Sequence, residues 1–213
     1  MGGLFVVFEG GDGVGKSHHA RWLAEWLASR GLEVVRTFEP GDTRVGSELR
    51  RIVLDPATGD LSHRTEALLY AADKAEHVDT VVLPALERGE VVVTDRYVDS
   101  TLAYQGAGRV LDVAEVEHVN RWATGELRPD LTILLDVDPA RAVGAMEVKD
   151  RMEDAGDAFH ARVRDGFLTL AGREPARYLV LDARAPREEN IALVRGRVAP
   201  LLGLSAASGS MGT

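Results

Sequence analysis

The sequence predicts an α/β fold, with a three-layer, doubly wound sheet of five parallel strands between helices. Five short runs are rich in Val, Leu and Ile and show no alternation of apolar with polar residues, which is typical of strands buried on both faces of a parallel sheet. Amphipathic stretches follow these runs, and strands that alternate with helices give a parallel sheet covered on both sides. A ligand crevice is then expected at the carboxyl ends of the strands.

The elements are expected in regular succession along the chain. Strands are predicted at residues 4–8, 34–38, 91–94, 131–137 and 178–181. Helices are predicted at residues 17–30, 45–54, 65–88, 113–123, 158–173 and 187–198. Gly31 is expected to end the first helix, and Asp112 with Glu115 to cap the fourth. Because Pro84 lacks an N–H group and clashes with the preceding turn, the long third helix is expected to kink or break there.

One domain is expected to span residues 1–204. A length of 213 residues suits a single α/β domain, and no internal repeat or domain-sized linker interrupts the pattern. Residues 205–213 are small and polar, so this tail is expected to be disordered, with residues 209–213 a candidate non-native extension.

The composition limits the classes of partner. The formal net charge of −9 argues against sequence-independent binding of nucleic acid, which needs a basic face. The chain contains no cysteine, so neither a disulfide framework nor a thiolate metal site is expected. No apolar run approaches the roughly 20 residues that span a bilayer, and no basic region precedes an apolar stretch at the start of the chain. We therefore expect a soluble, cytoplasmic protein without a membrane partner.

A glycine-rich stretch at residues 9–17 joins the first strand to the first helix. The phosphate-loop pattern G-x-x-x-x-G-K-[ST] is matched from Gly10 to Ser17, in the strand–loop–helix context that it requires. Backbone N–H groups would point at phosphate oxygens, Lys16 would neutralise the β- and γ-phosphates, and Ser17 would hold Mg²⁺. A plain glycine-rich turn is the alternative. We expect a nucleoside triphosphate to bind at Gly10, Gly11, Asp12, Gly13, Val14, Gly15, Lys16, Ser17 and His18.

Two charged residues follow the third strand. Asp95 stands at the strand's carboxyl end, where a carboxylate beside the phosphate loop can hold Mg²⁺ directly or through water. A turn-forming or capping role for Asp95 is the alternative. Arg96 comes next and places a fork of donors at the crevice, which suits a phosphate or a carboxylate.

Several motifs taken together resemble the thymidylate kinase family. They are FEGGDGVGKS at residues 8–17, FEPGDT at 38–43, DRY at 95–97, STLAYQG at 100–106, DRME at 150–153 and FHARVR at 159–164. The resemblance runs from about residue 4 to residue 202. It implies a phosphate-loop nucleoside monophosphate kinase fold with a short lid. It also implies a homodimeric cytoplasmic enzyme that transfers phosphate from ATP to dTMP with Mg²⁺, giving ADP and dTDP for dTTP biosynthesis.

The resemblance assigns an acceptor site. Arg96 would bind the phosphate of dTMP, and Asp12 would bond the sugar 3′-hydroxyl or support that phosphate clamp. Tyr70 would stack on thymine, a contact worth about 1–3 kcal/mol. The alternatives are a loop-shaping role for Asp12 and a core position for Tyr70. The remaining acceptor contacts would come from Phe38, Glu39, Pro40, Gly41, Thr43, Lys74, Ser100, Tyr104 and Gln105.

A polar stretch at residues 144–156 is expected to form the lid. Arg151 would close over the transferring phosphoryl group, and Lys149 is the second candidate, because a cation that arrives late stabilises charge spread over three oxygens. In this family the extra cation lies either in the phosphate loop or in the lid, and Gly13 stands where the first type carries arginine. A solvated loop is the alternative. The expected catalytic set is Asp12, Lys16, Arg96 and Arg151.

The sequence departs from the family pattern at a few positions. Lys74 stands where arginine usually reaches the thymine carbonyl, and a lysine lacks the planar fork of donors. Phe38 and Asp42 stand where many bacterial members have arginine and glycine. Gly144 falls near the position of an arginine that covers the adenine, for which Arg141 is a candidate substitute. We expect weaker discrimination of the base from Lys74, and none of these changes removes a residue that the phosphoryl transfer needs.

Two other functions fit parts of the pattern. A kinase for another small acceptor, such as dUMP or a deoxynucleoside, would keep the phosphate loop and the two arginines. A nucleotide-binding switch or an ATPase module would need no acceptor, but no Asn-Lys-x-Asp signature of a guanine-specific switch is present. A panel of acceptors tested with ATP separates these possibilities.

Overall fold

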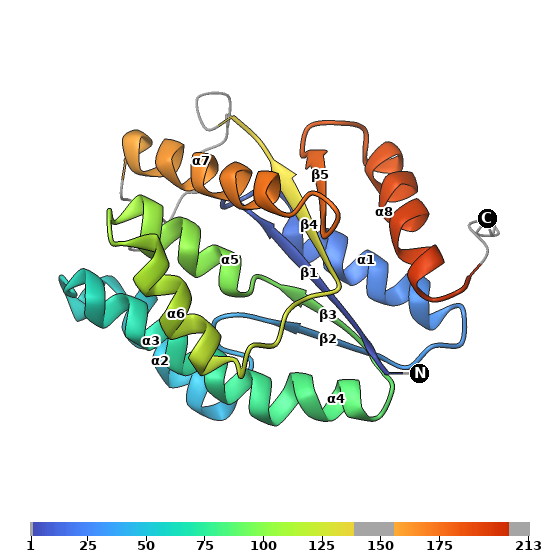
Figure 1. Cartoon of the computed structure of the whole chain (residues 1–213), viewed down its shortest axis with the longest axis horizontal. Coiled ribbons are helices and arrows are strands. Elements are labelled where there is room, and N and C mark those ends of the chain that lie inside the picture. Colours follow the sequence, from blue (N-terminus) through green and yellow to red (C-terminus); the bar gives the residue numbers. More distant parts are fainter. Residues whose placement is uncertain (1, 139–155, 205–213) are drawn as a thin grey trace.

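The computed structural model describes residues 2–138 and 156–204. Its centre is a five-stranded parallel sheet with strand order β2-β3-β1-β4-β5 (Figure 1). The strands are β1 Leu4–Gly10, β2 Val34–Phe38, β3 Val91–Asp95, β4 Leu131–Asp136 and β5 Tyr178–Asp182. The predicted doubly wound α/β fold is therefore confirmed, and each strand lies within two residues of its predicted bounds.

Helices cover both faces of the sheet (Figure 1). The α-helices are α1 Lys16–Ala28, α2 Arg44–Leu54, α3 His63–His77, α4 Leu83–Glu87, α5 Val98–Thr101, α6 Val113–Ala123, α7 Asp157–Arg173 and α8 Arg187–Leu201. Three shorter helices accompany them: the 3₁₀-helix η1 Pro56–Thr58 and the π-helices η2 Val78–Val82 and η3 Leu102–Gly108.

The core lies on the two sides of the central strand β1. Because successive side chains of a strand point to opposite faces, Val6 and Phe8 pack with α1 and α8 on one face. Phe5 and Val7 pack with η2, α4 and Tyr97 on the other. The second face continues where η3 and α7 pack over β4. Trp22 and Trp26 of α1 are each 7% exposed and stack with ring centroids 6.3 Å apart.

The helix predicted at residues 65–88 is one continuous helical run with a change of winding. α3 passes into the π-turn η2, and α4 begins just before Pro84. A proline lacks the N–H that an interior helical position donates, so the wider turn in front of Pro84 accommodates the predicted break.

The segment α5–η3 was not predicted as helical. Most of η3 is buried, so it shows no amphipathic period, and it contains Gly106 and Gly108, which disfavour helices. Packing explains the second glycine, because a Cβ at Gly108 would lie 2.6 Å from the ring of Phe159 on α7. The sequence pattern assigned no element to this segment, and tertiary packing, which outweighs the local preference of the chain, makes it helical.

Side-chain caps mark several helix starts. Asp112 accepts hydrogen bonds from the backbone N–H groups of Ala114 and Glu115, which confirms the predicted cap of α6. Thr43 and Ser62 cap α2 and α3 in the same way.

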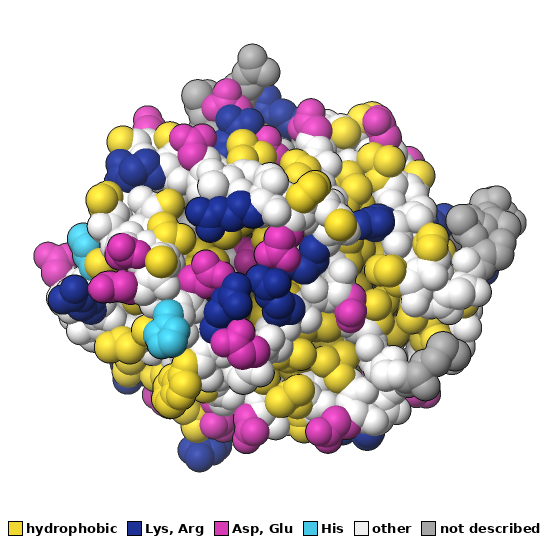
Figure 2. All heavy atoms as spheres, in the orientation of Figure 1, with side chains coloured by type: hydrophobic (Ala, Val, Ile, Leu, Met, Phe, Trp, Pro, Cys, Tyr) yellow, Lys and Arg dark blue, Asp and Glu magenta, His cyan; other side chains and the backbone are white. Residues whose placement is uncertain are grey.

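The surface charge and the helix lengths can be described for the residues that the structure covers. On the face in Figure 2, Lys and Arg side chains alternate with Asp and Glu side chains, and no broad basic surface forms there. Within residues 2–138 and 156–204, every helix is too short or too polar to cross a membrane.

Candidate active site

The glycine-rich loop that matches the phosphate-loop pattern lies between β1 and α1, at the carboxyl edge of the sheet. Gly10 has φ +136°, a conformation that side chains disfavour, and a Cβ there would collide with the backbone carbonyl of Leu135 on β4. α1 begins at Lys16 without an acidic residue in its first turn. Its positive end is therefore free to attract an anion.

Lys16 is folded over this loop. Its side chain is buried, and Nζ donates a hydrogen bond to the carbonyl of Gly11 at 2.5 Å. Burial and the nearby Arg96 lower the pKa of Lys16 to about 8, against the opposing charges of Asp12 and Asp95. A bound polyphosphate would add negative charge and favour the protonated ammonium.

Ser17 and Asp95 supply oxygen ligands of the kind that Mg²⁺ prefers. The Ser17 hydroxyl donates a hydrogen bond to Asp95 Oδ2, so the first turn of α1 meets the tip of β3. Asp95 Oδ1 is buried and has no hydrogen-bond partner among the described residues. A single carboxylate with a hydroxyl fits Mg²⁺, which usually keeps several waters and binds substrate phosphates. The described residues hold no cluster of three His, Asp or Glu side chains that could replace this site.

Arg96 joins the phosphate loop to the neighbouring cavity. Its Nη1 donates hydrogen bonds to the Gly10 carbonyl at 3.1 Å and to Ser100 Oγ at 3.0 Å, and its Nη2 donates to Asp12. Asp12 also accepts a hydrogen bond of 2.7 Å from the Tyr104 hydroxyl. Burial alone would raise the pKa of Asp12, but Arg96 and Lys16 lower it below its ordinary value. The carboxylate therefore stays ionised and orients the guanidinium.

Glu9 was missed by sequence reasoning, although it lies inside the quoted motif. It is fully buried, and its Oε1 accepts hydrogen bonds from the backbone N–H groups of Tyr97 at 2.9 Å and Ser100 at 3.1 Å. Its Oε2 accepts one from Ser100 Oγ at 2.6 Å. Arg96 has φ +71°, which is unusual for a residue with a side chain, and Glu9 holds the turn that contains it. The available signal was a lone carboxylate in an otherwise apolar buried strand.

A cavity of about 730 Å³, including its open mouth, lies beside Arg96. Its walls come from the end of β2, from α2 and α3, and from the α5–η3 segment. Every predicted acceptor residue in the following set lines it: Asp12, Glu39, Pro40, Tyr70, Lys74, Arg96, Ser100, Tyr104 and Gln105. Sequence reasoning missed four lining residues, namely Arg50, Leu54, Tyr97 and Thr101.

Phe38 does not line this cavity. Its side chain is 38% exposed and its ring lies 5.8 Å from the guanidinium carbon of Arg50. Arg50 in turn donates a hydrogen bond of 2.7 Å to the Pro40 carbonyl. The side chain at position 38 therefore supports the wall from outside. Gly41 and Thr43 also lie outside the lining, where Gly41 N–H bonds Asp73 and Thr43 caps α2.

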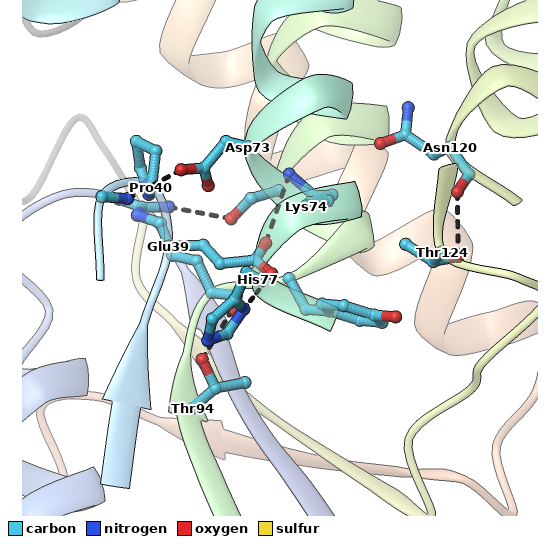
Figure 3. A network of polar contacts seen from close by, with 12 residues as sticks. Glu39, Pro40, Asp73, Lys74, His77, Thr94, Asn120 and Thr124 are labelled. Atoms are coloured by element: carbon cyan, nitrogen blue, oxygen red, sulfur yellow. Dashed lines mark hydrogen bonds and ion pairs between the residues drawn. The ribbon is translucent and has the colours of Figure 1, made fainter. Parts of the chain in front are cut away.

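One wall of the cavity carries an aromatic ring next to a lysine. Lys74 Nζ lies 5.7 Å from the centre of the Tyr70 ring. It also lies 3.4 Å from Glu39 Oε2 (Figure 3). Gln105 also lines the cavity, and its Nε2 donates a hydrogen bond of 3.1 Å to the buried Glu66. A planar ring flanked by polar groups suits a nucleobase.

The predicted lid residues Lys149 and Arg151 lie outside the described residues, as do Arg141 and Gly144. The helix α7 that follows them is anchored by Arg164, which donates hydrogen bonds of 2.7 and 2.8 Å to the two oxygens of Asp136 at the end of β4.

Comparisons with known proteins give one consistent result. The family model for thymidylate kinase matches residues 8–193. The thymidylate kinase of Cutibacterium acnes is 58% identical over 202 residues, which cover 95% of this chain and 99% of that protein. The thymidylate kinase of Clavibacter michiganensis is 52% identical over 212 residues, covering 98% and 100%. The crystal structure of thymidylate kinase from Ehrlichia chaffeensis superposes with a TM-score of 0.76 at 30% identity, covering 95% and 100%.

Proposed function

The chain belongs to the thymidylate kinase family and phosphorylates dTMP to dTDP with a nucleotide as phosphate donor, and from this premise we propose that the donor is ATP with Mg²⁺. The phosphate loop would hold the β- and γ-phosphates through its backbone N–H groups and Lys16. Ser17 and Asp95 would hold Mg²⁺, which would neutralise charge on the phosphates when bound. The unpartnered Asp95 Oδ1 supports this assignment.

The acceptor is proposed to lie in the cavity beside Arg96. The observation that carries this placement is the double contact of Arg96, which bonds Gly10 in the phosphate loop and also lines the cavity. A phosphate on Arg96 would therefore face the donor across the loop. Tyr70 would stack on the thymine ring, while Lys74 and Gln105 would meet its polar edge.

Each of the proposed catalytic residues has a separate role, which follows from its position in the site. Arg96 would orient the acceptor phosphate, and Asp12 would hold Arg96 and meet the sugar. Lys16 would stabilise charge on the transferring group. Arg151 is proposed to add a further cation from the lid, and such an arginine is worth about 10³–10⁵ in rate in related phosphoryl transfers.

The role of Arg151 has a direct kinetic test. Arg151→Ala should lower kcat by about 10³ with little change in KM for dTMP, because the contact forms mainly in the transition state. Steady-state kinetics with both substrates measure this. Normal turnover by the variant would remove Arg151 from the mechanism.

The enzyme is also proposed to be a cytoplasmic homodimer. Two large apolar side chains are exposed on helices that contact each other, Leu68 of α3 at 57% and Trp122 of α6 at 81%. A second copy that covers them would account for their exposure. Light scattering of the purified protein tests this, with a monomer mass as the contradicting result.

The substrate assignments are tested by crystals grown with dTMP and a non-hydrolysable ATP analogue. We expect the pyrimidine ring on Tyr70 and its phosphate on Arg96. An acceptor panel assayed with ATP should show preference for dTMP over dUMP and deoxynucleosides. A base bound elsewhere would overturn the assigned cavity.

A further inference from the structure

A buried polar network lies directly behind the base wall of the cavity. It consists of Thr37, Glu39, Asp42, Lys74 and His77, and we call it the His77 network. His77 is the last residue of α3 and is 1% exposed. Its Nδ1 lies 2.7 Å from Glu39 Oε1 (Figure 3). Its Nε2 lies 2.6 Å from Thr37 Oγ1. Thr37 Oγ1 also donates to Asp42 Oδ2 at 2.5 Å.

Counting hydrogens in this network fixes the charge of His77. A threonine hydroxyl carries one hydrogen, and here it is donated to the Asp42 carboxylate. Thr37 Oγ1 must then accept from His77 Nε2. Glu39 Oε1 belongs to an ionised carboxylate that also pairs with Lys74, so it accepts from His77 Nδ1. Both ring nitrogens donate, and the ring is an imidazolium.

The surrounding charges agree with that count. Burial alone would lower the pKa of His77, but its hydrogen bond to Glu39 and the charges of Glu39, Asp73 and Asp42 raise it above its ordinary value. Burial and Glu39 raise the pKa of Asp73 to about 6. Lys74 contributes a second cation beside Glu39. Tyr97 is a neutral phenol, because burial and the charge of Glu39 raise its pKa above the ordinary value.

We propose that His77 is a positioning residue of the acceptor site, an imidazolium that fixes Glu39 and so presents the Lys74 ammonium to the base of dTMP. Glu39 divides its two oxygens, with Oε1 on His77 and Oε2 near Lys74. Among the described residues Lys74 Nζ makes no hydrogen bond, and its contact with Glu39 is a loose ion pair at 3.4 Å. Its donors therefore stay available to a base carbonyl.

Loss of the His77 proton would change this arrangement. A neutral imidazole donates through one nitrogen only, so either Glu39 or Thr37 would lose its donor. A carboxylate freed from His77 would turn toward Lys74 and compete with the base for its donors. The proposal rests on the proposed binding of dTMP in this cavity, and it predicts that the affinity for dTMP falls as the pH rises through the pKa of His77.

Lys74 and Asp42 both belong to this one network. An arginine carries a rigid fork of donors, whereas a lysine presents a flexible point charge. The lysine therefore depends more on a neighbouring carboxylate for its position.

The protonation of His77 is measured directly by NMR of the full chain labelled with ¹⁵N-histidine. His77→Gln identifies the His77 signals by their loss. We expect both ring nitrogens to show imidazolium shifts at about pH 7.5, about one unit above the ordinary pKa of histidine. A neutral tautomer at that pH would overturn the proposal, and this readout needs no turnover.

The pH dependence of kcat/KM for dTMP tests the positioning role. We expect KM for dTMP to rise about 5–10-fold on the basic side, with KM for ATP and kcat much less affected. Lys16 also has a pKa of about 8, so its loss of a proton adds a second decrease to the same pH profile of kcat/KM. Asp42→Asn therefore supplies the discriminating change, because removing that charge should move the His77 midpoint to lower pH by about 0.5–1 unit.

Matched variants separate positioning from folding. Asp60→Asn removes an equal charge at an exposed residue outside the network and should leave the midpoint unchanged. His77→Gln should raise KM for dTMP about 10-fold and remove the part of the pH dependence that comes from His77. An Asp42→Asn profile identical to that of Asp60→Asn would overturn the role, even if His77→Gln fails to fold. Failure to form dTDP at any pH would instead contradict the proposed function.

Discussion

The proposed donor side of the site is formed mainly by backbone groups, whereas the proposed acceptor side is formed mainly by side chains. The donor side is a backbone structure, in which residues 10–15 bend under the first turn of α1 and one lysine supplies charge. The acceptor side is a side-chain structure, in which the ends of β2, α3 and η3 bring buried charged groups together. The first depends on which conformations the chain allows at each position. The second depends on hydrogen bonds between residues that are far apart in sequence.

Because the two sides are built differently, different substitutions should disrupt them. The backbone loop should lose its ability to bind ATP when a Cβ is added at a glycine. The side-chain wall should lose affinity for dTMP when a ring or a charge is removed. Residues that contact both sides should be the most sensitive.

Arg96 and Lys16 are the strongest test, because they supply the charges where the two sides meet. We expect Arg96→Ala and Lys16→Ala each to lower kcat/KM by at least about 10³. Steady-state kinetics with both substrates measure the loss. Arg36→Ala, at an exposed position of β2, should leave kinetics unchanged. A mild effect at Arg96 would mean that the acceptor phosphate binds elsewhere.

Gly10→Ala tests the backbone cradle alone. The added Cβ would collide with the Leu135 carbonyl at φ +136°, so we expect unfolding to become easier by about 2–4 kcal/mol, with loss of ATP binding. Urea denaturation measures the stability. Gly31→Ala has φ +80° but meets nothing within 4 Å, so it should cost only about 1 kcal/mol. Equal costs would show that the collision with β4 is unimportant.

Tyr70 tests the side-chain wall. Tyr70→Leu keeps an apolar group but removes the ring, so KM for dTMP should rise about 5–150-fold, equivalent to about 1–3 kcal/mol, while KM for ATP stays unchanged. Tyr70→Phe keeps the ring and should bind nearly as well as the wild type. Comparable KM values for Tyr70→Leu and the wild type would exclude stacking.

Glu9 gives the smallest effect, which appears in stability. Burial and the neighbouring Asp99 raise the pKa of Glu9 from 4.5 to about 8. Between these values the native state keeps a proton that the unfolded chain releases, so the free energy of unfolding should fall as the pH rises. Glu9→Gln should remove part of this fall, by about 1 kcal/mol or 2–4 °C in Tm between pH 5 and 8. Calorimetry at both pH values measures it.

A matched control accompanies the Glu9 test. Glu33→Gln changes the same group at an exposed position, so its Tm should follow the wild type at both pH values. If Glu9→Gln and Glu33→Gln behave alike, Glu9 is ionised in the native state at neutral pH. The turn that holds Arg96 would then be supported by a carboxylate rather than a carboxylic acid.

The loop of the proposed donor side could be placed from sequence, and the walls of the proposed acceptor cavity only in part. A phosphate loop is a local structure, so the spacing from Gly10 to Ser17 was enough to place it between a strand and a helix. The fold followed from apolar runs for the same reason. The resemblance assigned Tyr70 and Lys74 to the acceptor site, and their spacing of four residues places them on one helix face, but no local pattern places that face beside Arg96 and Gln105.

Glu9 and His77 show why the rest was missed. Each is a polar residue buried by elements that are distant in sequence, and neither has a local pattern that marks its partner. Phe38 shows the reverse, since the resemblance assigned it a contact with the acceptor. Alternation along an extended chain turns it toward Arg50 and solvent instead.

The three tryptophans divide between two environments, which gives the protein built-in optical reporters. Trp22 and Trp26 stack under the guanidinium of Arg195 between α1 and α8, whereas Trp122 of α6 is 81% exposed. The emission of the stacked pair should follow unfolding of the whole domain. Quenching of Trp122 by iodide should instead follow association of two copies. One fluorescence titration can thus distinguish dissociation from denaturation without any added label.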